Sequence, residues 1–433
     1  MEMLYQYLWK YRLLSPDLAT TDGRSVTVLN PGRHNLDAGP DFSGARLRIG
    51  GQEWAGNVEV HVRASDWFRH GHDSDPAYGN VILHVVGVND ARIPDGHGGF
   101  IPQLTATFPE QFVTLYARLA EKISDVECAD LLPSLPPLAV TSWLDILAVE
   151  RMQQKSQRVL DTLAQVEGDW ERTCFITLAR ALGFGLNAEP LEMLARSIPL
   201  KFLARHSDDI VQLEALLIGQ AGLLDTSIHI FDEYYQLLCR EYFFLARKYG
   251  LKPLRHDIWK FARTRPQNFP IRRIAMLAQS VSGGFSLLSR ILETRPDSES
   301  LAPLFDWRLS EYWATHIDFD QPGTRLPMTL SHDNITLLLI NLVAPMLYAH
   351  GASRSDPDFA ERGLDLWREL EPENNSVIRR WTAAGIPCTS ATDSQALLQL
   401  RREYCDRSRC LDCRFGHTLL RSASHNPPVY AHK

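Results

Sequence analysis

Two acidic residues and a histidine in the first part of the chain have the types and spacing of a metal site. Asp41 follows Pro40 in a glycine-rich turn, and Glu59 and His61 lie two apart in the alternating stretch VEVHV. Alternate residues of a strand share a face, so Glu59 and His61 should point the same way. If Asp41 begins a neighbouring strand, about 4.8 Å away, Asp41 and Glu59 converge on one Mg²⁺ or Mn²⁺ ion that activates water against a phosphodiester. The alternative is a solvated strand face beside an ordinary Pro-Asp turn.

A histidine-rich segment just after this stretch offers a second set of ligands. Four side chains of SDWFRHGHDSD are of types that zinc or manganese accepts: Asp66, His70, His72 and Asp75. A hydrogen-bonded polar loop is the alternative for this segment. His84 interrupts the apolar run NVILHVV and is interpreted as a core histidine.

A third constellation lies near the end of the chain, where three cysteines have the spacing C-x4-C-x2-C: Cys405, Cys410 and Cys413. This spacing matches the first three ligands of a plant-type [2Fe–2S] cluster and also suits a zinc turn. Cys128, Cys388 and His417 are the candidates for a fourth ligand. Either metal is expected to be structural rather than catalytic, and the alternative is a group of free buried cysteines.

The elements that must position these groups follow from the apolar patterning. We expect a helix over residues 2–14, a short helix after Ser65, and strands over 25–29, 44–49, 54–62, 80–88 and 102–108. Residues 131–140 are proline-rich, and apolar residues then recur at helical spacing to about residue 350. The predicted fold class is α+β, with an N-terminal mixed-sheet lobe and a mostly α-helical body. The expected domains are 1–130, 141–350, and a helical C-terminal region 351–433 with the cysteine cluster and a flexible tail.

Composition limits the class of protein. The 433 residues are 45% hydrophobic and 22% charged, as in an ordinary globular protein, with a net charge of −7 and a pI of about 6.1. This acidic balance excludes a general polyanion binder. Because no uninterrupted apolar run reaches the length of a membrane span and the N-terminus carries charges, we expect a cytoplasmic protein without a membrane partner. The oligomeric state is left open.

One basic segment still fits a nucleic-acid partner. In WKFARTRPQNFPIRRIAMLAQ (residues 259–279), lysine and arginines alternate with tryptophan and phenylalanines, which suits phosphate pairing and base stacking. The favoured alternative is that the basic stems cover a helix face while the aromatic rings fill the core.

The lobe resembles the PD-(D/E)xK nuclease superfamily, whose core has the order strand, strand, strand, helix, strand. Pro40, Asp41 and Glu59 match its motif, whereas His61 stands where the superfamily has lysine. Members often carry an acidic residue on the first helix, and Glu2 is the only candidate here. Some RecB-type nucleases of this superfamily hold the lobe with one cysteine before or beside it and three after the helical part. That resemblance implies Cys128 as the fourth ligand.

The whole chain also resembles an uncharacterised bacterial family known only as a domain of unknown function. The strings that carry this resemblance are AGPDF, VEVHVRASDW, NVILHVV, ALGFGLN, RPQNFPIRRIAMLA, DSQALLQL and CLDCRFG. The resemblance implies one protein type rather than a fusion, and it implies no activity.

The first functional hypothesis is a metal-dependent nuclease-like protein that hydrolyses nucleic-acid phosphodiesters. Asp41 and Glu59 would hold the ion, and His61 would position the water or act as base. The second hypothesis is a non-catalytic nucleic-acid-binding or scaffold protein on a degenerate nuclease core, since His61 replaces lysine. The third is a different metal hydrolase that uses His70, His72 and Asp75.

Overall fold

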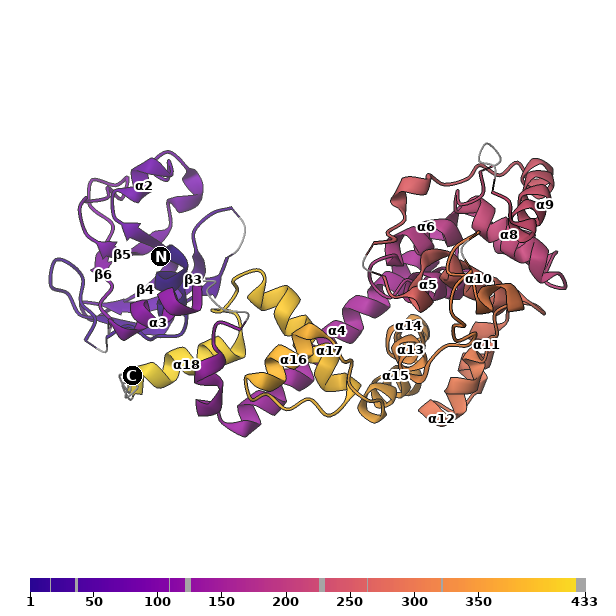
Figure 1. The fold of residues 1–433 in the computed structure, drawn as a ribbon. Helices are drawn as coiled ribbons and strands as arrows, with labels where there is room; N and C mark the ends of the chain where they lie inside the picture. Colours follow the sequence, from indigo (N-terminus) through magenta and orange to yellow (C-terminus); the bar gives the residue numbers. More distant parts are fainter. Residues whose placement is uncertain are drawn as a thin grey trace. The chain divides into compact units, whose positions relative to one another are not determined.

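The computed structural model describes residues 1–15, 17–35, 38–108, 110–120, 126–225, 230–262, 264–320 and 322–425 (Figure 1). The chain divides into two compact units. The first comprises Met1–Trp143, Ala383–Ile386 and Leu400–Lys433, and the second comprises Leu144–Thr382 and Pro387–Gln399. The expected C-terminal region 351–433 is thus divided between the two units, and its last residues lie outside the described part of the chain. The predicted α+β class is confirmed.

A mixed sheet forms the centre of the first unit. Its strands are β1 (Val26–Asn30), β2 (Arg33–His34), β3 (Phe42–Ile49), β4 (Gln52–Arg63), β5 (Val81–Val88) and β6 (Gln103–Thr105). The order is β1-β3-β4-β5-β6, with β2 on the edge of β3. Strands β1, β3 and β4 pair antiparallel, whereas β4, β5 and β6 pair parallel.

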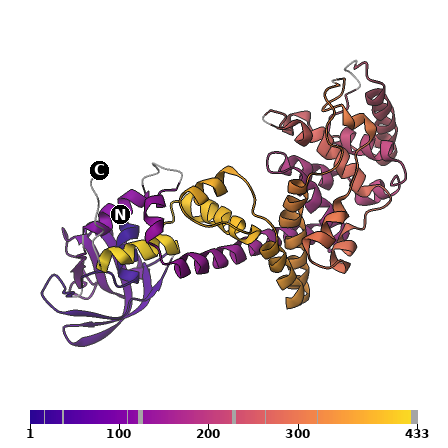
Figure 2. The same cartoon turned by 60° about the horizontal axis from the view of Figure 1, so that its bottom comes forward.

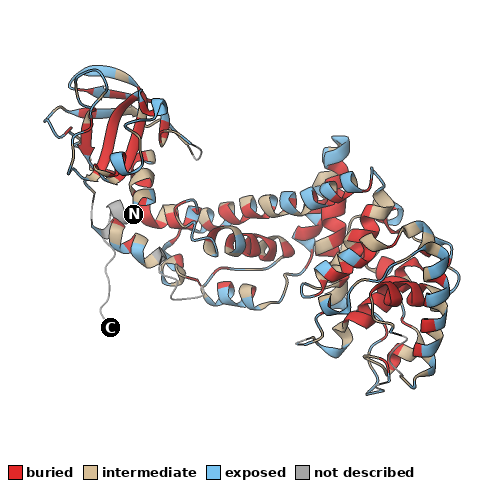
Figure 3. Cartoon of the chain, turned by 90° about the horizontal axis from the view of Figure 1, so that it is seen from above, coloured by how far each residue is buried: buried red, intermediate tan, exposed pale blue. Residues whose placement is uncertain are grey.

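The local sequence explains why β4 and β5 occupy the middle of this sheet. The residues of β5 from Val81 to Val86 are all buried, as a nearly continuous apolar run predicts for a strand covered on both faces. A parallel partner requires a crossover. The polar segment between the two strands supplies it through the short helix α2 (Asp66–Arg69) and the 3₁₀ turn η1 (Pro76–Tyr78). In Figure 3 the strands of the sheet are largely coloured as buried.

Helices from both ends of the chain belong to the same unit as this sheet. They are α1 (Glu2–Lys10), α3 (Gln111–Ala120), the 3₁₀ turn η2 (Ala129–Ser134), the π-helical turn η8 (Leu400–Cys405) and α18 (Arg414–His425). Helix α1 packs against β4, and α18 lies against α3 (Figures 1 and 2). The C-terminal segment is therefore an integral part of the N-terminal unit.

The second unit is entirely helical in the residues described. Its long entry helix is α4 (Pro137–Gln165), whose first residues belong to the first unit. The α-helices that follow are α5 (Trp170–Leu182), α6 (Ala188–Ser197), α7 (Leu200–Ala204), α8 (Ile210–Gln220), α9 (Glu233–Tyr249), α10 (Pro270–Val281), α11 (Leu287–Glu293), α12 (Ser298–Leu301), α13 (His332–Leu338), α14 (Ala344–Arg354), α15 (Pro357–Glu369), α16 (Ser376–Ala383) and α17 (Ala391–Gln399). Short turns join them: η3 (His256–Ile258), η4 (Pro266–Asn268), η5 (Ala302–Phe305), η6 (Glu311–Ala314) and the π-helical η7 (Leu339–Val343).

One continuous helical segment of this unit, His332–Arg354, is long and apolar enough to cross a membrane by length and composition. No segment of this kind was expected from the sequence. Of its most apolar window, 67% is buried within the structure. Such burial is the property of a core helix, and the segment is weak evidence for a membrane span.

Candidate metal centre

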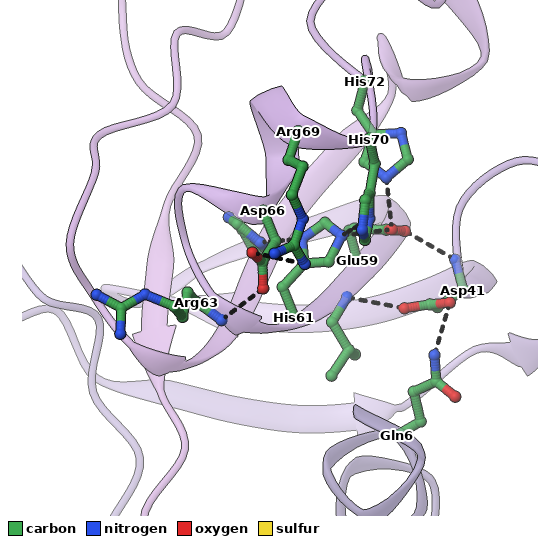
Figure 4. Close-up of polar contacts among 11 residues, drawn as sticks. Gln6, Asp41, Glu59, His61, Arg63, Asp66, Arg69, His70 and His72 are labelled. Atoms are coloured by element: carbon green, nitrogen blue, oxygen red, sulfur yellow. Dashed lines mark hydrogen bonds and ion pairs between the residues drawn. The ribbon is translucent and has the colours of Figure 1, made fainter. Parts of the chain in front are cut away.

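Asp41 and Glu59 meet across the antiparallel pair of β3 and β4. Because Phe42 pairs with Val58, the preceding Asp41 stands opposite Glu59. The Asp41 backbone N–H donates to Glu59 Oε2 at 2.9 Å, and the Val60 N–H donates to Asp41 Oδ2 at 3.0 Å (Figure 4). These reciprocal contacts hold both carboxyl groups beside the same stretch of β3 and β4.

Helix α1 also contributes a side chain to the Asp41–Glu59 pair. Gln6 donates its side-chain N–H to Asp41 Oδ1 at 2.9 Å (Figure 4). Glu2 lies close enough for its charge to raise the pKa of both Asp41 and Glu59. The helix takes this position because Leu4 and Leu8, one turn apart, are fully buried. The acidic candidate on the first helix is therefore near the pair, and Gln6 is a site residue that the sequence analysis missed.

Burial dominates the electrostatics of the two carboxyl groups. Glu59 is only 4% exposed, and burial, followed by the neighbouring Asp41, raises its pKa to about 9. Burial raises the pKa of Asp41 to about 6, although the bonds from Val60 and Gln6 act in the opposite direction. The alternative of a solvated strand face is wrong, because Glu59 and His61 are both buried. A cation is the natural countercharge for two such carboxylates.

Two imidazoles contact the other oxygen of Glu59, and a third lies beside them. One ligand atom from each of His61, His70 and His72 lies within 4.8 Å of the others. Glu59 Oε1 is 3.3 Å from His72 Nε2 and 3.5 Å from His61 Nε2 (Figure 4). Glu59 thus stands between Asp41 and the histidines. Nitrogen and oxygen donors in this combination suit zinc, manganese or another transition ion.

The crossover between β4 and β5 positions these imidazoles. Asp66 accepts a hydrogen bond from the Arg63 N–H at 3.1 Å and pairs with Arg69, which fixes the start of α2. His72 then folds back so that its ring stacks on Tyr78, with centroids 3.8 Å apart. His70 is exposed and His72 is half-buried, so the cluster is open to solvent on this side.

His61 is the most constrained of the histidines. Its Nδ1 lies 2.9 Å from His84 Nε2, and its Nε2 lies 3.1 Å from His70 Nδ1. Burial, followed by His70 and His72, lowers the pKa of His61 to about 3. With both ring nitrogens engaged, His61 is better placed to orient its neighbours than to take a proton from water. His84 also contacts the cluster. Its interpretation as a core histidine did not predict this contact.

Two acidic residues of the histidine-rich segment accept hydrogen bonds from backbone N–H groups. Asp75 accepts the N–H of Ala77 at 2.9 Å and caps η1, and Asp66 binds the start of α2 as described. In the structure, the histidines of the predicted set therefore join Glu59 and His61 rather than Asp66 and Asp75.

The predicted cysteines also gather within the first unit. None of the seven cysteines, all of which lie in the described part of the chain, forms a disulfide. Burial, followed by the neighbouring Cys413 and Cys410, raises the pKa of the Cys128 thiol to about 12. The pKa of Cys405 is raised by burial and by Cys413, Cys128 and Cys410. Of the other two candidates for the fourth position, Cys388 belongs to the second unit, whereas His417 lies one turn after Cys413 in the first unit, with its Nδ1 2.7 Å from the Tyr7 hydroxyl.

In the basic segment 259–279, Arg272 and Arg273 face the core of the second unit, whereas Lys260 and Arg265 are exposed. Arg272 is 2% exposed, and one of its N–H groups donates to the carbonyl of Pro327 at 2.6 Å. Arg273 is 4% exposed, and its guanidinium lies 4.5 Å from the ring centre of Phe184. These arginines are not available to phosphates. Arg263 of the same segment lies outside the described residues.

Fold and site together define an α+β protein whose mixed sheet carries a carboxylate–histidine cluster with the donor types of a metal centre. The chain belongs to the family described as protein of unknown function (DUF2851), whose model matches residues 2–376. No curated protein and no solved structure matches the chain. The family match includes the metal-centre candidates of the sheet and ends before the three C-terminal cysteines.

Proposed function

We propose that the protein is a metal-dependent, nuclease-like hydrolase of nucleic-acid phosphodiesters. The observation that carries the proposal is the position of Asp41 directly opposite Glu59 on β3 and β4. The order of helix, antiparallel strands, crossover helix and parallel strand agrees with the superfamily that the lobe resembles. Glu2 on α1 lies close enough to influence both carboxyl groups.

The donor set fits a divalent cation. Bound Mg²⁺ or Mn²⁺ supplies polarisation of a phosphoryl oxygen and a water of lowered pKa. Asp41 and Glu59 would hold the ion, and Gln6 donates a hydrogen bond that keeps the Asp41 carboxyl group in place. His61 stands where the superfamily has lysine and, through Glu59 and His70, orients the groups around it.

The experiment measures cleavage of labelled single-stranded DNA, duplex DNA and RNA by the full chain with Mg²⁺, Mn²⁺ or chelator. We expect cleavage only with metal, and Asp41→Asn and Glu59→Gln should each lower it by more than about 100-fold. Glu53→Gln, which changes an exposed carboxylate on the same strand, is the matched control. Unchanged cleavage in Asp41→Asn would refute the assignment.

A second candidate function is a different metal hydrolase centred on the histidines. The grouping of His61, His70 and His72 favours it. Glu59 contacts both groups, so its variants cannot separate the two functions. The discriminating pair is Asp41→Asn against His70→Gln: activity that survives the first and is lost in the second belongs to the histidine centre.

The non-catalytic alternative is tested by calorimetry. A scaffold built on a degenerate core should not bind Mg²⁺ or Mn²⁺ through Asp41 and Glu59. Metal binding that Asp41→Asn abolishes would contradict the scaffold. For either function we propose a cytoplasmic location, where nucleic acid is accessible and thiols stay reduced.

A further inference from the structure

Helix α9 of the second unit carries aromatic rings and cations on its solvent side, and the proposed catalytic site uses none of them. The helix packs against α8 and lies at the edge of the unit (Figure 1). We propose that this side of α9 binds single-stranded nucleic acid, with a base against the rings and phosphates against the cations. The choice of nucleic acid as the ligand rests on the proposed function.

Two consecutive phenylalanines of α9 are exposed. Phe243 is 64% exposed and Phe244 is 65% exposed, although the same helix buries Leu238 and Leu245 completely. Rings that stay in water add little to stability, and adjacent exposed apolar residues usually mark a binding surface. A nucleic-acid base offers such rings a flat partner, because every base has a face that stacks on an aromatic side chain.

Cations flank both rings at the spacing of one helical turn. Arg240 and Lys248 lie four residues before and after Phe244, and Arg247 lies four residues after Phe243. Residues four apart share a helix face, so each ring lies next to a basic side chain. All three basic residues are exposed, and none forms an ion pair with any residue that the structure describes. The helix dipole favours cations in the last turn, where Arg247 and Lys248 stand, but it does not explain Arg240.

A pocket beside Phe243 has the size of a nucleotide site. Its volume is about 540 Å³, within the range of pockets that bind small molecules. One wall is the face of α9 from Cys239 to Gly250, and the opposite wall includes Leu224 and the segment 251–253 that follows the helix. Because Phe243 belongs to both the pocket and the exposed face, a base can enter the pocket while its backbone stays on the surface of α9.

Hydrogen bonds hold the walls of this pocket in place. Gln220, at the end of α8, is 2% exposed and donates its side-chain N–H to the Lys252 carbonyl at 2.8 Å. The Leu254 N–H donates to the Gln220 carbonyl at 2.8 Å. On the other side, the Tyr235 hydroxyl bonds to the N–H and the carbonyl of Asp225, at 2.8 and 2.9 Å. The pocket is therefore preformed, which lowers the entropic cost of binding.

The chemistry of the pocket favours nucleic acid over a lipid surface, the other common partner of a helix with rings and cations. Asp225 places a carboxyl group in the lining, where it can accept a hydrogen bond from a sugar hydroxyl or a base amino group. An acyl chain has no such donor. Because the chain carries a net charge of −7, a local group of cations must supply the attraction for phosphates.

The test is fluorescence anisotropy of the full chain with labelled single-stranded DNA or RNA of about 10 nucleotides, in chelator so that no strand is cleaved. We expect binding that weakens as salt rises. Phe243→Ala should raise the dissociation constant by at least about 5-fold, as for the loss of one stacked base. Arg247→Gln should raise it and also reduce the salt dependence. The controls are Phe100→Ala, an exposed phenylalanine of the first unit, and Arg290→Gln, an exposed arginine of α11.

The outcomes separate this surface from the proposed catalytic site. A preference for DNA or for RNA identifies the strand, and either result supports the surface. Absence of binding, or equal binding by the wild type, Phe243→Ala and Arg247→Gln, would overturn the proposal. Tighter binding to vesicles of phosphatidylcholine and phosphatidylserine than to either strand would also overturn it. Cleavage that α9 variants bind and perform normally counts against α9 alone, whereas binding at α9 without cleavage counts against the proposed function alone.

Discussion

The hydroxyl of Tyr7 and the Nδ1 atom of His417 are hydrogen-bonded at 2.7 Å although 410 positions separate them in sequence. The bond joins the first helix of the chain to the last one described. Burial raises the pKa of Tyr7, so the hydroxyl stays protonated and able to donate. The ring of Tyr11 adds a contact with His417, with centroids 4.4 Å apart.

Replacement of Tyr7 by phenylalanine should lower the stability of the first unit. The variant keeps the ring and removes the bond to His417, which leaves a half-buried imidazole without this partner. The expected cost is about 1–2 kcal/mol, measured as a lower midpoint of chemical unfolding. Tyr11→Phe is the control, since the hydroxyl of that exposed tyrosine should contribute little. Equal midpoints for Tyr7→Phe and the wild type would show that the bond does not form in solution.

Gln6→Leu should weaken metal binding at the carboxylate pair. The substitution removes the N–H that fixes Asp41 Oδ1 and leaves the helix intact. Loss of such an orienting partner typically costs about 10–100-fold in metal affinity. Calorimetric titration with Mn²⁺ measures the change, with the exposed Gln52→Leu as control. An unchanged affinity would mean that Asp41 does not ligate the ion.

His70→Gln should change metal preference rather than abolish binding altogether. His70 belongs to the histidine group and not to the Asp41 contacts. Its loss should weaken Zn²⁺ or Co²⁺ binding far more than Mg²⁺ binding, because imidazole is a ligand of transition ions. His97→Gln changes an exposed histidine of the same unit and serves as the control. Equal losses for both classes of ion would argue for a single shared site.

Gly416→Ala should disrupt the cysteine turn. The added methyl group would meet the Cys410 carbonyl at 2.1 Å, so α18 must move away from the turn. We expect a destabilisation of about 1–3 kcal/mol, measured as a lower midpoint of chemical unfolding. Gly323→Ala is the matched control, because the nearest atom to a Cβ there is 3.9 Å away. An unchanged unfolding midpoint in Gly416→Ala would contradict this close packing of α18 on the turn.

A buried carboxyl group in the second unit should make stability depend on pH. Glu214 is fully buried and accepts hydrogen bonds from Trp313 Nε1 at 2.7 Å and from the Tyr234 hydroxyl at 2.8 Å. Burial raises its pKa from 4.5 to about 7 despite these bonds. The folded state therefore binds a proton that the unfolded state releases. The stabilisation is complete below the unfolded pKa and is lost as pH rises through the folded pKa.

Glu214→Gln should remove this dependence. Relative to the variant, the wild-type chain should lose on the order of 3 kcal/mol of unfolding free energy as pH rises from below 4.5 to above 7. The glutamine carbonyl still accepts from Trp313 and Tyr234. Urea unfolding at several pH values measures the difference, and Glu189→Gln, an exposed carboxylate, is the control. Parallel profiles for wild type and Glu214→Gln would show that Glu214 is ionised in the folded state.

Local sequence patterns were sufficient to predict several features of this protein. The alternation in VEVHV placed Glu59 and His61 on one face of β4, and the apolar run of β5 predicted a strand buried on both faces. The period of a strand and the period of a helix are properties of short segments, so the α+β class and the helical second unit followed from sequence. The spacing of Cys405, Cys410 and Cys413 could likewise be recognised within one short segment.

Only the tertiary structure decided which distant groups meet. The register of β3 on β4 placed Asp41 opposite Glu59, and the packing of α1 brought Gln6 to Asp41. The crossover after β4 turned His70 and His72 toward Glu59 and left Asp75 as a helix cap. Burial of Arg272 and Arg273 removed them from any surface that binds phosphate. These outcomes depend on strand register, crossover path and side-chain burial, which join segments far apart in the chain and have no local periodic signal.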